Sequence, residues 1–339
     1  MVLCFYRHVF EEGFRMSKKN RKIVNIDEGL EGEARAFDQQ ILERVNHGHM
    51  PDLRHKKRTE WFYNNVWRDP EYIKMSFIEN INFFLRHLDK ESKVLEVGCG
   101  PGHNSLELAR HGHHVTGIDI SPLCIEIAKK TLAQNRYRDG FGSLNYYADD
   151  FLKIDIPDAP FAAVLCYGSL SHFPDLKRVL DRVSSLLVPS GTILVWDTSV
   201  DLYSKNDAAI LYLIRSILAF TGHYYYNKEK LPADESALVK EINSIFDELM
   251  YLDEEGSNVQ SPNDNCNTHQ EMIAGLDDRF KQIVFTPEAC FYRNLIGGIR
   301  FKRRKDQVSM AHFIKLIETE MIKSGMLSPA FFYYVGKKR

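Results

Sequence analysis

The sequence predicts an α/β protein in which helices cover both faces of a mostly parallel sheet. Three observations lead to this fold class. Apolar runs of strand length alternate with helix-like periodicity between residues 93 and 196, a glycine-rich turn joins the first run to a helix, and the composition is globular, with 44% hydrophobic and 27% charged residues. Such alternation is typical of βαβ units, because parallel strands need long crossover connections.

Two helices are expected before the first strand. The first covers residues 33–45, where four apolar side chains repeat at helical spacing within an otherwise polar segment. The second begins at Asp69-Pro70, because aspartate is a favourable N-cap and proline suits the first helical position, and it continues to residue 88.

The alternating region then supplies five strands and three helices. The predicted strands are 93–97, 114–118, 144–147, 161–166 and 192–196. The predicted helices between them are 104–111, 122–134 and 176–187. Gly112 closes the first of these helices, Ser121 caps the second, and a Pro-Ser-Gly turn at 189–191 precedes the fifth strand.

After residue 197 the alternation stops. Two helical patterns, 208–220 and 236–251, are followed by a polar stretch that ends near residue 267. Regular elements then return as helices at 269–276 and 307–323 and strands at 281–285 and 330–335. An insertion of this length inside a regular fold is more often functional than idle.

Charge and cysteine usage narrow the class of protein. A net charge of -2 and a pI of about 6.7 disfavour a nucleic-acid binder driven by global charge. Six cysteines without a CxxC pair predict reduced, cytoplasmic usage and no metal site. The most apolar run, 208–222, is too short to span a bilayer and contains Arg215. Residues 1–15 lack a secretion signal and precede a second start at Met16, so they are read as an upstream extension.

The glycine-rich turn is the first functional candidate. Gly98, Gly100 and Gly102 form a G-x-G-x-G pattern between a strand and a helix, which departs from the dinucleotide G-x-G-x-x-G. Glu96 comes just before the glycines, where its charge would repel a pyrophosphate and attract an ammonium group. An amino-acid-bearing nucleoside fits both features. Alone, the loop could equally hold another nucleotide or form only a tight turn.

Acidic residues at the next two strand ends extend this candidate. Asp119 ends the second strand about twenty residues beyond the glycines, where a carboxylate can accept from both hydroxyls of a ribose. At the end of the third strand, Asp149-Asp150-Phe151 offers a carboxylate and a backbone N–H to an adenine. Asp119 could instead cap the next helix, although Ser121 serves that role better.

From Leu88 to about Ser199, these motifs resemble the class I S-adenosylmethionine-dependent methyltransferases. The resemblance implies a Rossmann-like seven-stranded sheet and S-adenosyl-L-methionine as the cofactor. It assigns the methionine part to Glu96 and the glycines, the ribose to Asp119, and the adenine to Asp150 with Phe151, or to Asp149. The full set of cofactor-binding candidates is Glu96, Gly98, Cys99, Gly100, Gly102, Asp119, Ile120, Asp149, Asp150, Phe151 and Cys166.

The same resemblance divides the chain into four parts. Residues 1–68 are an N-terminal extension and helical cap, 69–200 the cofactor-binding core, 201–267 a helical lid insertion, and 268–339 the C-terminal part of the core. The insertion would lie over the carboxyl ends of the strands, where ligands bind in such sheets. Its apolar helices could alternatively form a homodimer interface.

The segment after the fourth strand is implied to line the methyl group and the acceptor. There His172 is the catalytic candidate for a general base, and Tyr167 could wall the cofactor or the acceptor. A loop histidine that caps the next helix or packs against Phe173 is the alternative for His172. Cys99 and Cys166 could be buried fillers instead of ligand contacts.

The predicted reaction is transfer of a methyl group to a hydroxyl or amine of a small polar molecule. Basic runs at 55–58 and 300–305 would suit an anionic acceptor, such as a nucleotide-linked or phosphorylated sugar, if both fold toward the pocket. Residues 51–68 vaguely resemble stretches in bacterial methyltransferases that are associated with surface polysaccharide. A tRNA or protein methyltransferase and a non-catalytic cofactor-binding protein remain the alternatives.

Overall fold

The computed structural model of the protein describes residues 30–253 and 255–339. Its centre is a seven-stranded sheet with the order β3-β2-β1-β4-β5-β7-β6. The strands are β1 (Lys93–Val97), β2 (His114–Asp119), β3 (Ser143–Ala148), β4 (Phe161–Tyr167), β5 (Leu187–Thr198), β6 (Phe280–Glu288) and β7 (Phe331–Lys338). β7 runs antiparallel to both of its neighbours, β5 and β6, and the other strand pairs are parallel. The predicted fold class is confirmed, whereas the upstream extension predicted for 1–15 lies outside the described residues.

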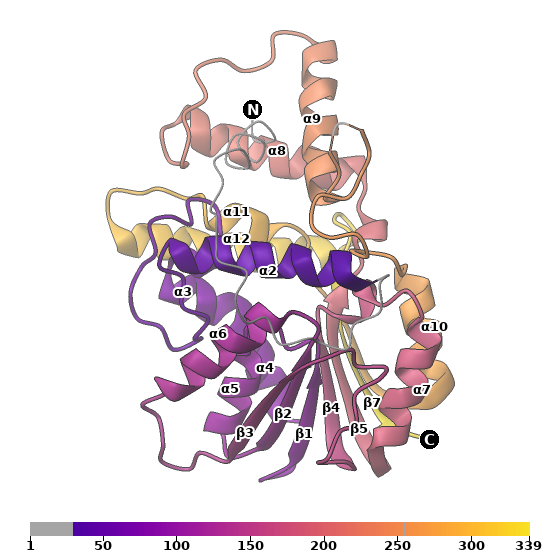
Figure 1. Ribbon diagram of the computed structural model, residues 1–339. Helices are drawn as coiled ribbons and strands as arrows, with labels where there is room; N and C mark the ends of the chain where they lie inside the picture. The colour runs from indigo at the N-terminus through magenta and orange to yellow at the C-terminus, as the bar shows by residue number, and fades with distance from the viewer. Residues whose placement is uncertain (1–29, 254) are drawn as a thin grey trace.

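Helices cover both faces of the sheet (Figure 1). The crossover helices are α5 (His103–Arg110), α6 (Pro122–Ala133) and α7 (Leu176–Leu186). Alternate strand residues point to opposite faces, so Leu194 joins the core cluster under α5 and α6, while Val195 joins the cluster under α7 and α10 (His269–Arg279). This double burial explains why the central strands read as continuous apolar runs.

The helix predicted from Asp69-Pro70 to residue 88 is interrupted. It consists of α3 (Pro70–Ile73), a π-helical turn (Lys74–Ile78) and α4 (Glu79–Leu85). Side chains from other elements donate hydrogen bonds to the carbonyl groups of the wide turn. Lys315 Nζ donates to Met75 O at 2.6 Å, and Arg293 donates to Ser76 O at 2.6 Å. These tertiary contacts stabilise a turn that apolar spacing alone does not predict.

Two further differences concern the second half of the sheet. The Pro-Ser-Gly turn predicted at 189–191 lies inside β5 as an irregularity, where the register with β4 shifts and Ser190 has φ 59°. The short α11 (Tyr292–Ile296) is absent from the predicted elements, because five residues are too few to show helical periodicity. The longer α12 (Arg304–Lys323) follows it.

The remaining helices lie at the ligand edge of the sheet. In Figure 1, α2 (Glu31–Asn46) crosses above the carboxyl ends of the strands, and α8 (Lys205–Phe220) and α9 (Glu235–Leu249) stand beyond it. A partly buried ion pair joins these two helices, since Arg215 meets Glu248 with two N···O distances of 2.7 Å. None of the described helices is long and apolar enough to cross a membrane.

Candidate cofactor and acceptor site

Three glycines turn the chain from β1 into α5, all with positive φ. A Cβ added at Gly98 would lie 2.6 Å from Ser169 Cβ, and one added at Gly102 would collide with the Tyr146 hydroxyl. A Cβ added at Gly100 would meet no atom within 4 Å. The outer glycines are therefore required by packing, whereas the open space over Gly100 leaves the backbone accessible to a ligand.

Asp119 ends β2 beside this loop. Its Oδ2 accepts a hydrogen bond from Gly100 N at 2.6 Å, and its Oδ1 accepts one from Ser121 N at 2.9 Å. The side chain of Ser121 caps α6 by accepting from Cys124 N at 3.0 Å, which leaves Asp119 free of that role. Burial raises the pKa of Asp119 to about 6. Each carboxylate oxygen keeps a lone pair that a ribose hydroxyl can use.

Glu96 lies beneath the loop with a side chain that is almost fully buried. Asn104 Nδ2 donates to its Oε1 at 3.2 Å, and the Ser105 hydroxyl donates to its Oε2. Burial raises the pKa of Glu96 to about 7. The carboxylate therefore holds the first turn of α5 in place, and its contact with an ammonium group stays a prediction.

The end of β3 separates the two adjacent aspartates. Asp150 is buried, accepts from Leu152 N at 2.8 Å and lies 3.7 Å from Lys153 Nζ, so its carboxylate is committed to the local turn. Asp149 is half-buried, and its backbone N–H donates to Asp119 O at 3.0 Å, which joins the ends of β2 and β3. Asp149 Oδ1 also accepts from Asp150 N at 2.8 Å, so both carboxylates make a local bond, and the less buried Asp149 is the one we expect to face an adenine.

Phe151, Cys99 and Cys166 are buried, whereas Ile120 is half-buried beside Asp119. The ring of Phe151 packs against Phe173 with centroids 6.3 Å apart, so only its backbone is available to a base. Burial raises the pKa of both thiols, which is the behaviour of small apolar fillers.

His172 lies between two carboxylates. Its Nδ1 lies 2.9 Å from Glu33 Oε1 on α2, and its Nε2 lies 3.4 Å from Asp264 Oδ1 in the polar tract. Burial opposes its charged form, but the bond to Glu33 and the charge of Asp264 raise the pKa of His172. Both ring nitrogens face carboxylates, so His172 joins three segments of the chain. Its role as a general base stays a prediction.

We call Glu33, His172 and Asp264 the carboxylate clasp. Glu33 also accepts from the Ser261 hydroxyl at 2.7 Å and from Asn263 N at 2.9 Å. Nearby, the buried Asp197 at the end of β5 accepts from Ser169 N at 3.0 Å and Leu170 N at 2.8 Å. These carboxylates position the loop after β4. The sequence offered no signal for the pairing of His172 with Glu33 and Asp264.

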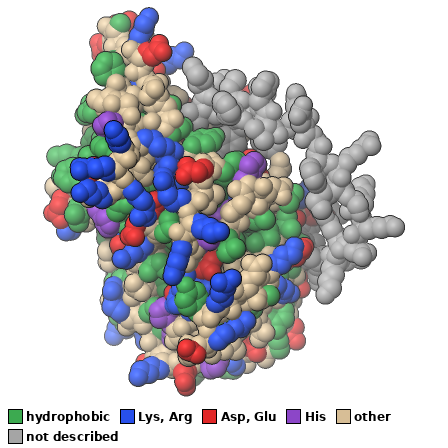
Figure 2. Space-filling model, turned by 90° about the vertical axis from the view of Figure 1, so that its left-hand side faces the viewer, with side chains coloured by type: hydrophobic (Ala, Val, Ile, Leu, Met, Phe, Trp, Pro, Cys, Tyr) green, Lys and Arg blue, Asp and Glu red, His purple; other side chains and the backbone are tan. Residues whose placement is uncertain are grey.

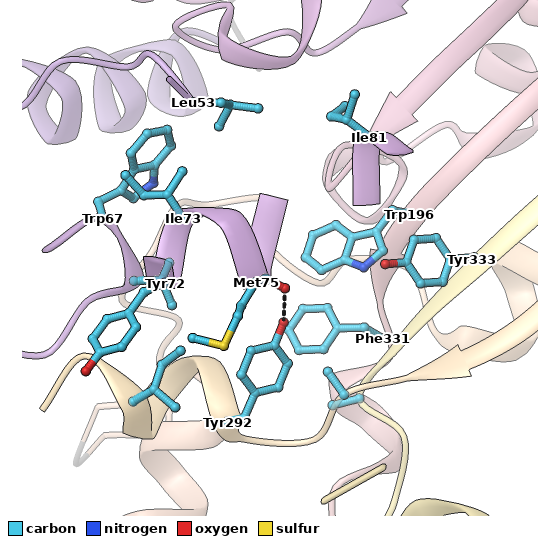
Figure 3. Packing of buried hydrophobic residues seen from close by; sticks show 14 of the residues in the cluster. Leu53, Trp67, Tyr72, Ile73, Met75, Ile81, Trp196, Tyr292, Phe331 and Tyr333 are labelled. Carbon is cyan, nitrogen blue, oxygen red and sulfur yellow. Dashed lines mark hydrogen bonds between the residues drawn. The ribbon is translucent and has the colours of Figure 1, made fainter. Parts of the chain in front are cut away.

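Tyr167 ends β4 at the ligand edge of the sheet, and its role as a wall of the site stays a prediction. Its ring stacks on Trp196 with centroids 4.5 Å apart, and its hydroxyl accepts from Asn80 Nδ2 at 2.8 Å. Burial raises the pKa of Tyr167, so the phenol stays protonated. Figure 3 shows further aromatic rings near Trp196, among them Phe331 and Tyr292, and the Tyr292 hydroxyl donates to Met75 O at 3.4 Å.

The two basic runs come together, but their charges are partly neutralised. Arg58 lies 3.4 Å from Asp69 Oδ2, and Arg304 lies 2.7 Å from Asp69 Oδ1. Arg300 donates to the backbone oxygens of Gly297 and Tyr63. Lys and Arg side chains gather on the upper part of the face in Figure 2, with acidic side chains among them. The runs therefore hold the N-terminal segment against α12, which weakens their predicted role as an anion site.

Comparison with known proteins finds a family match for the central part of the chain. Residues 94–191 match the model of a methyltransferase domain. A protein named ubiquinone biosynthesis O-methyltransferase from Coxiella burnetii is 34% identical over 126 residues, which are 37% of this chain and 49% of that protein. One of the same name from Xylella fastidiosa is 36% identical over 104 residues, 31% of this chain and 41% of its own.

Solved structures extend the likeness to most of the fold. The [4+2]-cyclase SpnF is 14% identical, with a TM-score of 0.50 over 93% of this chain and 97% of its own. At this identity the likeness shows the fold alone. The chain spans about half the length of the curated relatives it matches.

Proposed function

We propose that this chain, whose residues 94–191 are a class I methyltransferase domain, transfers a methyl group from S-adenosyl-L-methionine to a hydroxyl group of a small polar molecule. The predicted family is confirmed for that domain by its match and by the methyltransferase relatives. The observation that carries the proposal is the open space over Gly100, beside the carboxylate of Asp119 and the start of α5.

The residues at this edge fit the predicted cofactor. Asp119 can accept from a ribose, Asp149 from an adenine amine, and the backbone N–H groups at the start of α5 favour a carboxylate. When bound, the cofactor supplies an electrophilic methyl group on a sulfonium. The protein's contribution is alignment, because an in-line displacement needs acceptor oxygen, methyl carbon and sulfur in one direction.

Several features support a small acceptor. Tyr167 and Trp196 stack on each other in an aromatic cluster at this edge, and the carboxylate clasp holds α2 over the ends of the strands. The relatives carry O-methyltransferase names, which favours a hydroxyl over an amine. The pairing of Arg58 and Arg304 with Asp69 disfavours the tRNA alternative, which requires an open basic stripe.

Labelled methyl transfer tests this function. The purified protein and S-[methyl-¹⁴C]adenosyl-L-methionine are incubated with hydroxylated aromatic acids, sugar phosphates, nucleotide sugars, tRNA and peptides. We expect label on a small hydroxylated molecule. Label on a sugar would support the more specific proposal of a sugar acceptor. Label on tRNA or protein alone would overturn the small-molecule assignment.

The homodimer and the cytoplasmic location belong to the same proposal. Leu213, Ile217 and Phe220 of α8 are each more than half exposed, beside a groove of about 430 Å³ between α8 and α9. Sedimentation at micromolar concentration tests the dimer, because a single monomeric species would contradict it.

A further inference from the structure

Three buried polar atoms at the start of α5 have no partner in the part of the chain that the structure describes: Asn104 Oδ1 and the two ring nitrogens of His103. Both ring nitrogens of His103, the residue after Gly102, are inaccessible to solvent and form no hydrogen bond with any described residue. Buried side-chain nitrogens are nearly always bonded, and one left unsatisfied costs free energy, so this imidazole calls for a ligand or a water. His103 follows the glycine loop directly, which places it at the cofactor edge.

The surroundings of His103 are aromatic. Its ring meets Trp67 edge-on at 5.2 Å and Phe77 edge-on at 5.4 Å. Phe77 belongs to the π-helical turn, a distortion that is frequent at functional sites, and its ring also lies 6.4 Å from Tyr167. His103 is therefore linked through one phenyl ring to the stacked rings of Tyr167 and Trp196.

A cation also lies against Phe77. The guanidinium carbon of Arg293 is 5.6 Å from the Phe77 centroid and 4.6 Å from the Trp196 centroid. Its Nη2 donates to Ser76 O at 2.6 Å, while its buried Nε has no partner. Arg293 makes no ion pair with a carboxylate of the described residues, but Tyr167 hydrogen-bonds to it. Burial opposes its charged form, but the nearby charge of Glu288 raises its pKa. The unpartnered Nε is the atom left for an anion on a ligand.

We propose that His103 and Arg293 are the two polar ends of the acceptor site, where His103 takes the proton of the acceptor hydroxyl and Arg293 binds a carboxylate or phosphate on the same molecule. The acceptor class is thus a hydroxylated ring that carries an anionic group and lies across Phe77. This inference rests on the proposed function and replaces His172 as the base.

The proton balance follows from ordinary displacement chemistry. The acceptor oxygen forms a bond to the methyl carbon while the carbon–sulfur bond breaks, and that electron pair returns to sulfur as a thioether. The hydroxyl proton, made acidic as the oxygen is alkylated, passes to the unprotonated ring nitrogen of His103. Burial, together with the charge of Arg44, lowers the pKa of His103 to about 4, which keeps this nitrogen available at neutral pH.

The test uses 3,4-dihydroxybenzoate, its neutral methyl ester, glucose 6-phosphate and glucose as probes, with binding and turnover measured separately. Calorimetry on the S-adenosylhomocysteine complex should show tighter binding of the charged member of each pair. Arg293→Gln should reduce that preference roughly tenfold to a hundredfold, and Arg293→Lys should restore part of it. His103→Ala should lower kcat about a hundredfold or more while the affinity for S-adenosylhomocysteine stays unchanged.

His111→Ala is the matched control, because His111 ends the same helix and bonds only to the turn before it. It should retain wild-type kcat, and thermal unfolding of each variant identifies any loss of folding. Full turnover by His103→Ala, or equal binding of charged and neutral probes by the wild type, would overturn the inference. A wild type that binds S-adenosylhomocysteine but none of the probes contradicts the acceptor class alone, whereas no binding of S-adenosylhomocysteine contradicts the proposed function.

Discussion

Gly98 and Gly100 are separated by one residue, yet a methyl group added at the two positions would meet different surroundings. Both have positive φ, of 73° and 51°. At Gly98 the new Cβ would collide with Ser169, a residue of the loop after β4, whereas at Gly100 it would enter open space. Substitution at the two sites therefore separates the packing of the loop from its access to a ligand.

Gly98→Ala is expected to destabilise the fold by about 1–3 kcal/mol, because overpacking and left-handed backbone strain add. Gly100→Ala should change stability less, by about 1 kcal/mol from the backbone alone, but should weaken cofactor binding. Urea unfolding and calorimetry with S-adenosylhomocysteine measure the two effects. Equal loss of stability in both variants would mean that the space over Gly100 is not a ligand approach.

Asp119 should make cofactor binding depend on pH. Ribose hydroxyls donate to the ionised carboxylate, and burial raises its pKa to about 6, so affinity should rise as pH increases through 6 and fall about tenfold per pH unit below it. Glu96, with a pKa near 7, adds to the same trend if it faces the cofactor's ammonium. Asp119→Asn should bind more weakly and lose the step near pH 6. Constant wild-type affinity from pH 5 to 8 would rule out ionised Asp119 as the ribose ligand.

Among the elements, α2 is held by contacts remote in sequence. The carboxylate clasp joins it to the loop after β4 and to the polar tract near residue 264, and Glu33 is 139 residues from His172. No periodicity or spacing in a single sequence carries that information. The N-cap of α6 repeats the pattern, since Asp38 of α2 accepts from the Ser121 hydroxyl at 2.6 Å.

Removing one member of the clasp should loosen α2. Glu33→Gln leaves a charged His172 with one partner, and breaking a buried pair costs about 3–5 kcal/mol. Hydrogen exchange should accelerate in α2 and in residues 258–268. His114→Gln is the control, because that histidine is exposed at the opposite end of the sheet. Unchanged protection in α2 would contradict a structural role for the clasp.

The clasp should also respond to pH. The pKa of His172 is raised in the fold above the unfolded value of about 6.5, so its stabilisation is complete below that pH and is lost as pH rises through the raised value. Exchange in α2, corrected for the intrinsic rate, should therefore increase on the alkaline side. A histidine NMR titration of His172 checks the direction, and a pKa below 6.5 would contradict it.

For the whole molecule, the sheet was predictable and the site only in part. Strand β1 has the predicted bounds, because apolar runs buried on both faces are clear in sequence. Asp119 and the glycines were located by their position at strand ends. Partners brought together by tertiary packing were missed, including His103 with Phe77 and Arg293, because their contacts depend on the π-helical turn and on α11.

The most direct test of the central claim is calorimetric titration with S-adenosylhomocysteine, run beside NAD. We expect S-adenosylhomocysteine to bind at one site per chain, and Asp119→Ala to weaken it by about 1.5–3 kcal/mol for each hydrogen bond lost to the carboxylate. NAD should give no heat, because the loop lacks the dinucleotide spacing and Glu96 lies beneath it. Binding of NAD without binding of S-adenosylhomocysteine would contradict the account.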